Sequence, residues 1–189
     1  MKERLRLNPP RGGIRPDWKH DQDLKKYLEI LQRRHDRVAV TNGCFDILHP
    51  GHVHLLTYAK QCAWLKTSNL YLFVLVNNDE SVQALKGAYR PVLPFAHRAA
   101  VVLGVKDVDY VVGFGERTPE DLIRVIVPEV LIKGGSYVGD IVPGQQFVIA
   151  RGGLMLWVPE LEGWSTSQTV KRVQNPGPKT GFEGTHGQK

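Results

Sequence analysis

The hydrophobic residues of this chain gather in short unbroken runs, and the segments between the runs repeat their hydrophobic residues at helical spacing. Short unbroken runs are typical of strands that are buried on both faces of a parallel sheet. Apolar residues three and four positions apart indicate amphipathic helices. The pattern predicts strands at 38–41, 70–76, 108–112, 130–132 and 154–158.

Helices are expected between these strands, so the pattern predicts an α/β fold. The expected helices are 21–34, 53–63, 94–104, 143–150, 165–173 and one that begins at Pro119. Five strands that alternate with helices predict a single Rossmann-like domain with a doubly wound, five-stranded parallel sheet. The segment that contains Lys86, Arg90 and Pro91 is expected to be a loop.

The two ends of the chain lack this periodicity. Residues 1–17 mix arginine with proline and glycine, which predicts a basic, mobile arm. Residues 18–173 are expected to form the domain, and residues 174–189 read as a disordered tail. At 189 residues the chain is long enough to bury a hydrophobic core.

Composition and cysteine content argue against a membrane-spanning, a secreted or a disulfide-stabilised protein. Hydrophobic residues make up 42% of the chain, no run approaches the length of a membrane span, and residues 1–6 are not followed by the apolar stretch expected of a signal peptide. Cys44 and Cys62 cannot make a disulfide framework, which favours reduced thiols and a cytoplasmic location. Of the net charge of +6, residues 1–37 carry +5. Such an arm is compatible with nucleic-acid binding, but a solvated end is the commoner case and is expected here.

The stretch 38–53 carries the densest chemistry in the chain. Asn42-Gly43 ends the first predicted strand, and helical spacing begins again about ten residues later. A strand, a glycine turn and a helix in this order form the first unit of a nucleotide-binding α/β fold, because the helix N-terminus offers unpaired N–H groups to a phosphate. His49 and His52 lie at that N-terminus, and Gly51 between them lets a ligand approach the backbone.

The motif His49-Pro50-Gly51-His52 is the HxGH signature of the nucleotidyltransferase superfamily. The longer string 41–49, TNGCFDILH, resembles the adenylyltransferase domain that makes ADP-heptose from heptose 1-phosphate and ATP. The resemblance covers residues 18–173. It implies that a phosphate oxygen of a sugar phosphate attacks the α-phosphorus of a nucleoside triphosphate and expels pyrophosphate. The protein then has to position both reactants and neutralise developing charge, with no covalent intermediate.

The resemblance also implies roles for individual residues. The catalytic residues that it implies are His49, His52 and Lys86. The nucleotide-binding residues that it implies are Asn42, Gly43, Cys44, Phe45, Gly51, Lys133, Gly134, Ser165, Thr166 and Ser167. Hydroxyls and N–H groups at the helix start near Ser165 are expected to hold the β- and γ-phosphates. The expected acceptor-binding residues are Lys86, Arg90, Asn77 and Asp79, the last two because they follow a predicted strand.

Two positions distinguish the branches of the superfamily. Ser136 follows Lys133-Gly134-Gly135 where the family has an aspartate, so the acceptor stays open. Glu160 stands where the glycerol-phosphate and choline-phosphate cytidylyltransferases carry an arginine, which favours the branch that uses ATP. The sugar kinase domain that usually accompanies the resembled domain does not occur in the sequence, so either a separate kinase is expected to supply the acceptor or the acceptor is a different phosphate.

Some of these side chains also have structural interpretations. The spacing His49-x-x-His52-x-His54 suits a metal, but no matching set of ligands accompanies it, and no metal site is predicted. His54 is instead expected to be an exposed helix residue. Asp46 is expected to shape the turn, and Arg98 either matches a family arginine or pairs within the fold.

The sequence therefore predicts an enzyme that transfers AMP from ATP to a sugar 1-phosphate, with heptose 1-phosphate as the first choice. That activity belongs to carbohydrate metabolism and yields a lipopolysaccharide precursor. Magnesium is expected because such sites handle triphosphates as magnesium complexes. Two alternatives stay open: a cytidylyltransferase acting on a polyol phosphate such as glycerol 3-phosphate, and a non-catalytic nucleotide- or nucleic-acid-binding module. The resemblance is compatible with a homo-oligomer and gives no membrane partner.

Overall fold

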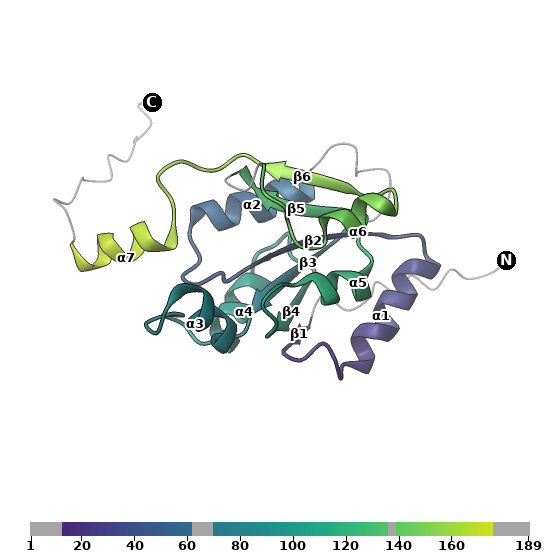
Figure 1. Cartoon of the computed structure of the whole chain (residues 1–189), viewed down its shortest axis with the longest axis horizontal. Helices are drawn as coiled ribbons and strands as arrows, with labels where there is room; N and C mark the ends of the chain where they lie inside the picture. The colour runs from purple at the N-terminus through teal and green to yellow at the C-terminus, as the bar shows by residue number, and fades with distance from the viewer. Residues whose placement is uncertain (1–12, 62–69, 136–138, 176–189) are drawn as a thin grey trace, which may run out of the picture.

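The computed structural model describes residues 13–61, 70–135 and 139–175 and has one parallel sheet at its centre (Figure 1). The strands are β1 (Ile14–Arg15), β2 (Arg37–Gly43), β3 (Leu70–Asn77), β4 (Tyr110–Phe114), β5 (Val130–Gly134) and β6 (Leu154–Val158). The helices are α1 (Gln22–Arg33), α2 (Pro50–Gln61), α3 (Asp79–Lys86), α4 (Phe95–Leu103), α5 (Glu120–Ile126), α6 (Gln145–Ala150) and α7 (Thr166–Gln174). The predicted α/β class and parallel sheet are confirmed.

Helices cover both faces of the sheet. Alternate residues of a strand point to opposite sides, so each strand can pack against both layers of helices. On β2, Val38 and Val40 face a core that contains side chains of α1, α5 and α6. Ala39, between them, faces a second core that contains side chains of α2 and α4. All three residues are at most 5% exposed, as expected of a strand covered on both faces. The doubly wound arrangement that the sequence predicts is therefore present.

The strand order, β1-β4-β3-β2-β5-β6, places a switch point beside β2. Thr41 of β2 pairs with Val74 of β3 on one side and with Ile132 of β5 on the other. The chain proceeds from β2 to β3 and β4 in one direction, and from β5 to β6 in the other. In open parallel sheets, ligands bind in the crevice that forms at such a point, outside the carboxyl ends of the strands.

The sheet has six strands rather than the predicted five. The additional strand is β1, where Ile14 pairs with Val111 and Arg15 with Val112 of β4. Its residues fall within the segment 1–17 that was expected to be a mobile arm. Two residues carry no period, so hydrophobic patterning could not reveal this strand. The domain boundaries otherwise stay predictions.

The expected loop after β3 contains a helix, α3, and Lys86 is its last residue. Asn78 caps this helix, since its side chain accepts a hydrogen bond from the backbone N–H of Ser81 at 2.8 Å. Asp79 and Glu80 in the first turn complement the helix dipole. The loop prediction was therefore wrong for Lys86, and the Asn-Asp-Glu start was the signal that could have corrected it, whereas Arg90 and Pro91 lie outside helices and strands as expected.

Four predictions concern residues outside the described ranges, namely those for the arm at 1–12, Cys62, Ser136 and the tail beyond residue 175. Within those ranges, α7 projects from the body of the fold and has no buried residue (Figure 1). No helix that the structure describes is both long and apolar enough to span a membrane.

Candidate active site

A cavity of about 550 Å³ lies at the carboxyl ends of β2, β5 and β6, beside the N-termini of α2 and α7. It brings together all the predicted site residues except Asp79: Asn42, Gly43, Cys44, Phe45, His49, Gly51, His52, Asn77, Lys86, Arg90, Lys133, Gly134, Ser165, Thr166 and Ser167. Segments more than 100 residues apart in the chain therefore meet in one site. Their roles in binding or catalysis stay predictions.

His49 and His52 stack on each other at the start of α2. Their ring centroids are 3.8 Å apart, with an interplanar angle of 24°. The centroid of Phe45 is 5.1 Å from that of His52, so the pair rests on an aromatic side chain. A Cβ at Gly51 would lie 3.1 Å from the His49 ring, which is tighter than an ordinary contact. A side chain at position 51 would crowd the His49 ring, so glycine allows the ring to keep its observed position.

Both histidine rings have lowered pKa values, and each has a nitrogen without a hydrogen-bond partner among the described residues. Burial lowers the pKa of His52 to about 3, with a smaller contribution from neighbouring His49, and burial also lowers the pKa of His49. Both rings are therefore neutral near pH 7. Nδ1 of each ring is buried and has no hydrogen-bond partner among the described residues. Because an unpaired buried polar atom is costly, a phosphate that reached these rings would gain from pairing with them.

Asp46 organises the loop that precedes α2. Its carboxylate accepts hydrogen bonds from the backbone N–H groups of Val92 and Leu93, at 2.9 and 3.0 Å, and from Arg90 Nε at 2.5 Å. Burial alone would raise the pKa of this carboxyl, but these three donors outweigh it and the pKa is lowered. Phe45 and Ile47, on either side, have positive φ values of 47° and 59°. The strained backbone turns Asp46 toward the 90–93 segment, so the turn-shaping role expected for it is seen.

Arg98 joins the ends of the neighbouring loops from inside the fold. Its fully buried guanidinium donates to the backbone carbonyls of Cys44, Leu93 and Asn77, the last at 2.8 Å. It also pairs with the Asp79 carboxylate at 2.7 Å. Arg98 thus pairs within the fold, as one of its two interpretations proposed. The same ion pair explains why Asp79 does not line the cavity.

The start of α7 approaches the same loop. Thr166 Oγ1 donates to the backbone carbonyl of Asp46 at 2.9 Å. Ser165 caps the helix, since its hydroxyl accepts from the backbone N–H of Gln168 at 3.2 Å. Ser167 lines the cavity and is exposed. Two helix N-termini, those of α2 and α7, therefore face one cavity and favour a polyanion there.

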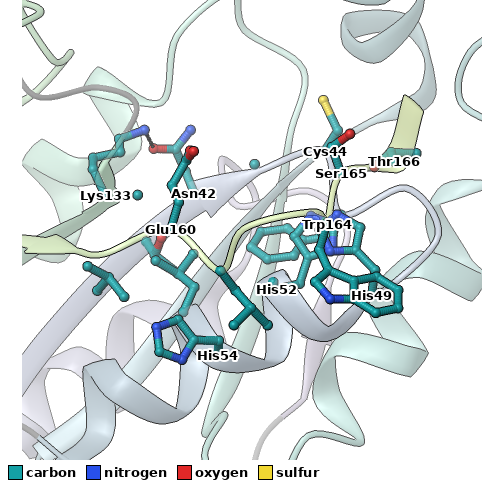
Figure 2. A pocket seen from close by; sticks show the side chains of 18 of the residues that line it. Asn42, Cys44, His49, His52, His54, Lys133, Glu160, Trp164, Ser165 and Thr166 are labelled. Carbon is teal, nitrogen blue, oxygen red and sulfur yellow. Dashed lines mark hydrogen bonds between the residues drawn. The ribbon is translucent and has the colours of Figure 1, made fainter. Parts of the chain in front are cut away.

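The opposite end of the cavity has different chemistry. Lys133 Nζ donates to Asn42 Oδ1, and burial lowers the pKa of this lysine to about 8. Figure 2 shows Lys133, Asn42 and Glu160 on one side of the cavity and His49, Trp164 and Ser165 on the other.

Sequence reasoning did not assign a site role to nine of the lining residues: Thr41, His54, Leu55, Leu85, Val158, Pro159, Glu160, Leu161 and Trp164. His54 was expected to face solvent, yet it lines the cavity. The segment 158–164 carries no motif, and only the tertiary fold brings it to the cavity. Among the described residues, no three or more His, Cys, Asp or Glu side chains form a group that could hold a metal ion.

A family pattern described as cytidylyltransferase-like matches residues 40–172, which are most of the chain. The chain belongs to the cytidylyltransferase-like family. The matched residues include both helix N-termini and the stacked histidines described above. The family membership that the HxGH motif predicted is therefore confirmed.

Curated relatives of this cytidylyltransferase-like chain include two bifunctional proteins HldE. The protein from Psychromonas ingrahamii is 43% identical over 155 residues, which are 82% of this chain and 31% of that protein. The protein from Methylococcus capsulatus is 45% identical over 172 residues, which are 88% of this chain and 33% of that protein. The chain thus spans about a third of the length of these relatives.

A solved structure shares the fold of the cytidylyltransferase-like chain. The crystal structure of the lipopolysaccharide core biosynthesis protein from Thermoplasma volcanium matches with a TM-score of 0.50 and 22% sequence identity. The match covers 66% of this chain and 96% of that chain. At this identity the likeness concerns the fold alone.

Proposed function

We propose that this protein transfers AMP from ATP to the phosphate of a sugar 1-phosphate, with heptose 1-phosphate as the acceptor. The observation that carries the proposal is the stacked His49–His52 pair, whose Nδ1 atoms lack a partner among the described residues. The pair lies between two helix N-termini in a cavity that also contains Lys86 and Arg90. Similarity to the bifunctional proteins HldE supports this branch of the family.

The reaction requires one bond to form and one to break at the α-phosphorus of ATP. An oxygen of the sugar phosphate attacks that phosphorus, and the bond to the leaving pyrophosphate breaks. Negative charge increases on the leaving group and on the α-phosphoryl oxygens. The neutral rings of His49 and His52 each carry one N–H group that can donate to those oxygens. Donors held in place before the reaction stabilise such charge without reorganisation.

Lys86 and Arg90 are proposed to bind the acceptor phosphate. Arg90 lies 80% buried beside Asp46, and its Nε is used by that carboxylate. The remaining guanidinium nitrogens can face the cavity that Arg90 lines. Lys86, at the exposed end of α3, adds a cation that can move with its long side chain.

Magnesium is proposed only as the partner of the triphosphate. Asp46 does not line the cavity and already accepts three hydrogen bonds, and Glu160 is the one carboxylate among the described residues that line it. Magnesium usually keeps several waters and binds through one or two carboxylates and the substrate phosphates. The residues described here therefore do not fit a dedicated magnesium site.

The proposal is tested by measuring pyrophosphate release with ATP and with CTP against a panel of acceptors. The panel contains heptose 1-phosphate, other hexose 1-phosphates, glycerol 3-phosphate and phosphocholine. We expect release with ATP and heptose 1-phosphate. Folded protein that releases no pyrophosphate with any pair would contradict the enzymatic proposal and favour a nucleotide-binding module.

The second candidate is a cytidylyltransferase that acts on a polyol phosphate. The family description favours it, because the matched pattern is named for cytidylyl transfer. Release with CTP and glycerol 3-phosphate, but not with ATP, would establish this candidate. For either reaction we propose a cytoplasmic location, where both nucleotides occur, and a homo-oligomer that size-exclusion chromatography can detect.

A further inference from the structure

The two ends of the cavity differ in charge. One end combines the N-termini of α2 and α7 with the stacked histidines, Lys86 and Arg90, and is suited to phosphates. The other end contains the carboxylate of Glu160 and the amine of Lys133, which already donates to Asn42 (Figure 2). A carboxylate repels a triphosphate and can only accept hydrogen bonds. The neutral part of a nucleotide therefore fits beside Glu160.

The order of the strands also favours placing the base of the nucleotide beside Glu160. β2 leads to the histidines, β5 lies beside it and ends at Lys133-Gly134, and β6 is the next strand and leads to Glu160. Adjacent strands are about 4.8 Å apart, so Glu160 lies roughly 10 Å from the phosphate end across the sheet. A nucleoside triphosphate carries its phosphates, ribose and base in that order. The base accordingly reaches the end of β6.

The surroundings of Glu160 suit a flat ring with a polar edge. Its Oε1 lies 4.0 Å from where a Cβ at Gly134 would stand, so backbone without a side chain faces the carboxylate. Leu55, Val158 and Leu161 line the cavity with apolar surface. Ligand sites typically combine apolar walls with a few polar groups that fix orientation.

We propose that the Glu160 carboxylate accepts a hydrogen bond from the exocyclic amino group of the nucleotide base, and so selects amino-bearing bases over their oxo counterparts. Adenine and cytosine carry this amino donor, whereas hypoxanthine and uracil present a carbonyl oxygen at the same position. The carboxylate repels that oxygen. The inference rests on the proposed function, but it holds for either ATP or CTP as the substrate.

The experiment compares ATP with ITP, and CTP with UTP, in wild-type protein and in Glu160→Gln. A glutamine side chain can both accept from an amino group and donate to a carbonyl. Binding of each nucleotide is measured by calorimetry and by thermal stabilisation, without acceptor, and kcat/KM is measured where pyrophosphate is released. Glu162→Gln is the matched control, because Glu162 is two residues away and does not line the cavity.

We expect wild-type protein to prefer the amino nucleotide of its pair by about tenfold, the order of a charge-assisted hydrogen bond. Glu160→Gln should reduce this preference to about threefold or less, while Glu162→Gln keeps it. An unchanged preference in Glu160→Gln, or an equal loss in both variants, would overturn the inference. Wild-type protein that binds nucleotides but releases no pyrophosphate would contradict the proposed function alone, because the binding ratios still decide the role of Glu160.

Discussion

Buried polar side chains at the two ends of the cavity differ in whether they have a hydrogen-bond partner. At the phosphate end, Nδ1 of His49 and of His52 is buried without a hydrogen-bond partner among the described residues. At the opposite end, the nucleoside end with Asn42, Lys133 and Glu160, the Lys133 side chain is also buried, yet its amine donates to Asn42. The histidine pair at the phosphate end therefore keeps one nitrogen of each ring unpaired among the described residues, whereas Lys133 and Asn42 at the nucleoside end pair with each other.

This difference reflects what each end has to do in the proposed reaction. Charge changes at the α-phosphorus, so donors there are useful when they become paired only as the reaction proceeds. The nucleoside does not change during the reaction, so its end needs a fixed shape. Asp46 and Arg98 support the phosphate end, because they hold the segments 44–46, 77–79 and 90–93 together.

Replacing His52 should remove a proposed catalytic donor from the phosphate end of the cavity. His52→Ala is expected to lower kcat by about two orders of magnitude or more, the cost of losing one preorganised donor. The ring rests on Phe45 and His49, so some packing is also lost. Circular dichroism and thermal unfolding should nonetheless show a folded protein.

The matched control is His97→Ala, which removes an exposed imidazole from α4. It should leave both turnover and stability close to those of the wild type. Near-normal turnover of His52→Ala with the preferred substrate pair would exclude the role proposed for the histidine pair.

The histidine motif, Asn42 and Lys133 could be predicted as site residues from the sequence, whereas the segment 158–164 could not. His49, Gly51 and His52 are neighbours in the chain, so one local motif carries their geometry. Glu160 and Trp164 reach the cavity through the crossover from β6 to α7, and no local period marks them. The doubly wound sheet followed from apolar runs, but β1 was missed because its two residues owe their place to pairing with β4.

A change at Asp46 should disturb the support of the phosphate end. Asn cannot replace a carboxylate that accepts from Arg90, Val92 and Leu93 together. Asp46→Asn is expected to lower the free energy of unfolding at pH 7 by about 2–3 kcal/mol. It should also raise the KM for the acceptor phosphate, since Arg90 loses its anchor.

Urea unfolding at several pH values checks this prediction. The pKa of Asp46 is lowered in the folded protein, so its contribution to stability is present above the ordinary value of 3.8 and is lost as the pH falls through the folded pKa. Asp46→Asn should lack that part of the acid dependence. Asp17→Asn, which changes an exposed carboxylate beside His20, should stay within about 0.5 kcal/mol of the wild type. Equal effects of the two substitutions would argue against a special role for Asp46.

The smallest expected effect concerns the charge of Lys133 at the nucleoside end. Burial lowers its pKa to about 8, so below that pH the amine is charged in both the folded and the unfolded chain. Between pH 8 and 10.5 the unfolded chain binds the extra proton, and stability should therefore rise with pH across this window.

Affinity for ATP should change in the other direction, because the neutral amine of Lys133 no longer attracts the anion. We expect ATP binding to weaken by up to about tenfold from pH 7 to pH 9, because for a pKa of about 8 the charged fraction of the amine falls from about 0.9 to about 0.1. Calorimetric titrations would show this loss in wild-type protein and in Lys25→Gln, a surface control on α1, but a flat profile in Lys133→Gln. A wild-type profile as flat as that of Lys133→Gln would mean that the nucleoside end holds its ligand by shape and hydrogen bonds without help from this charge.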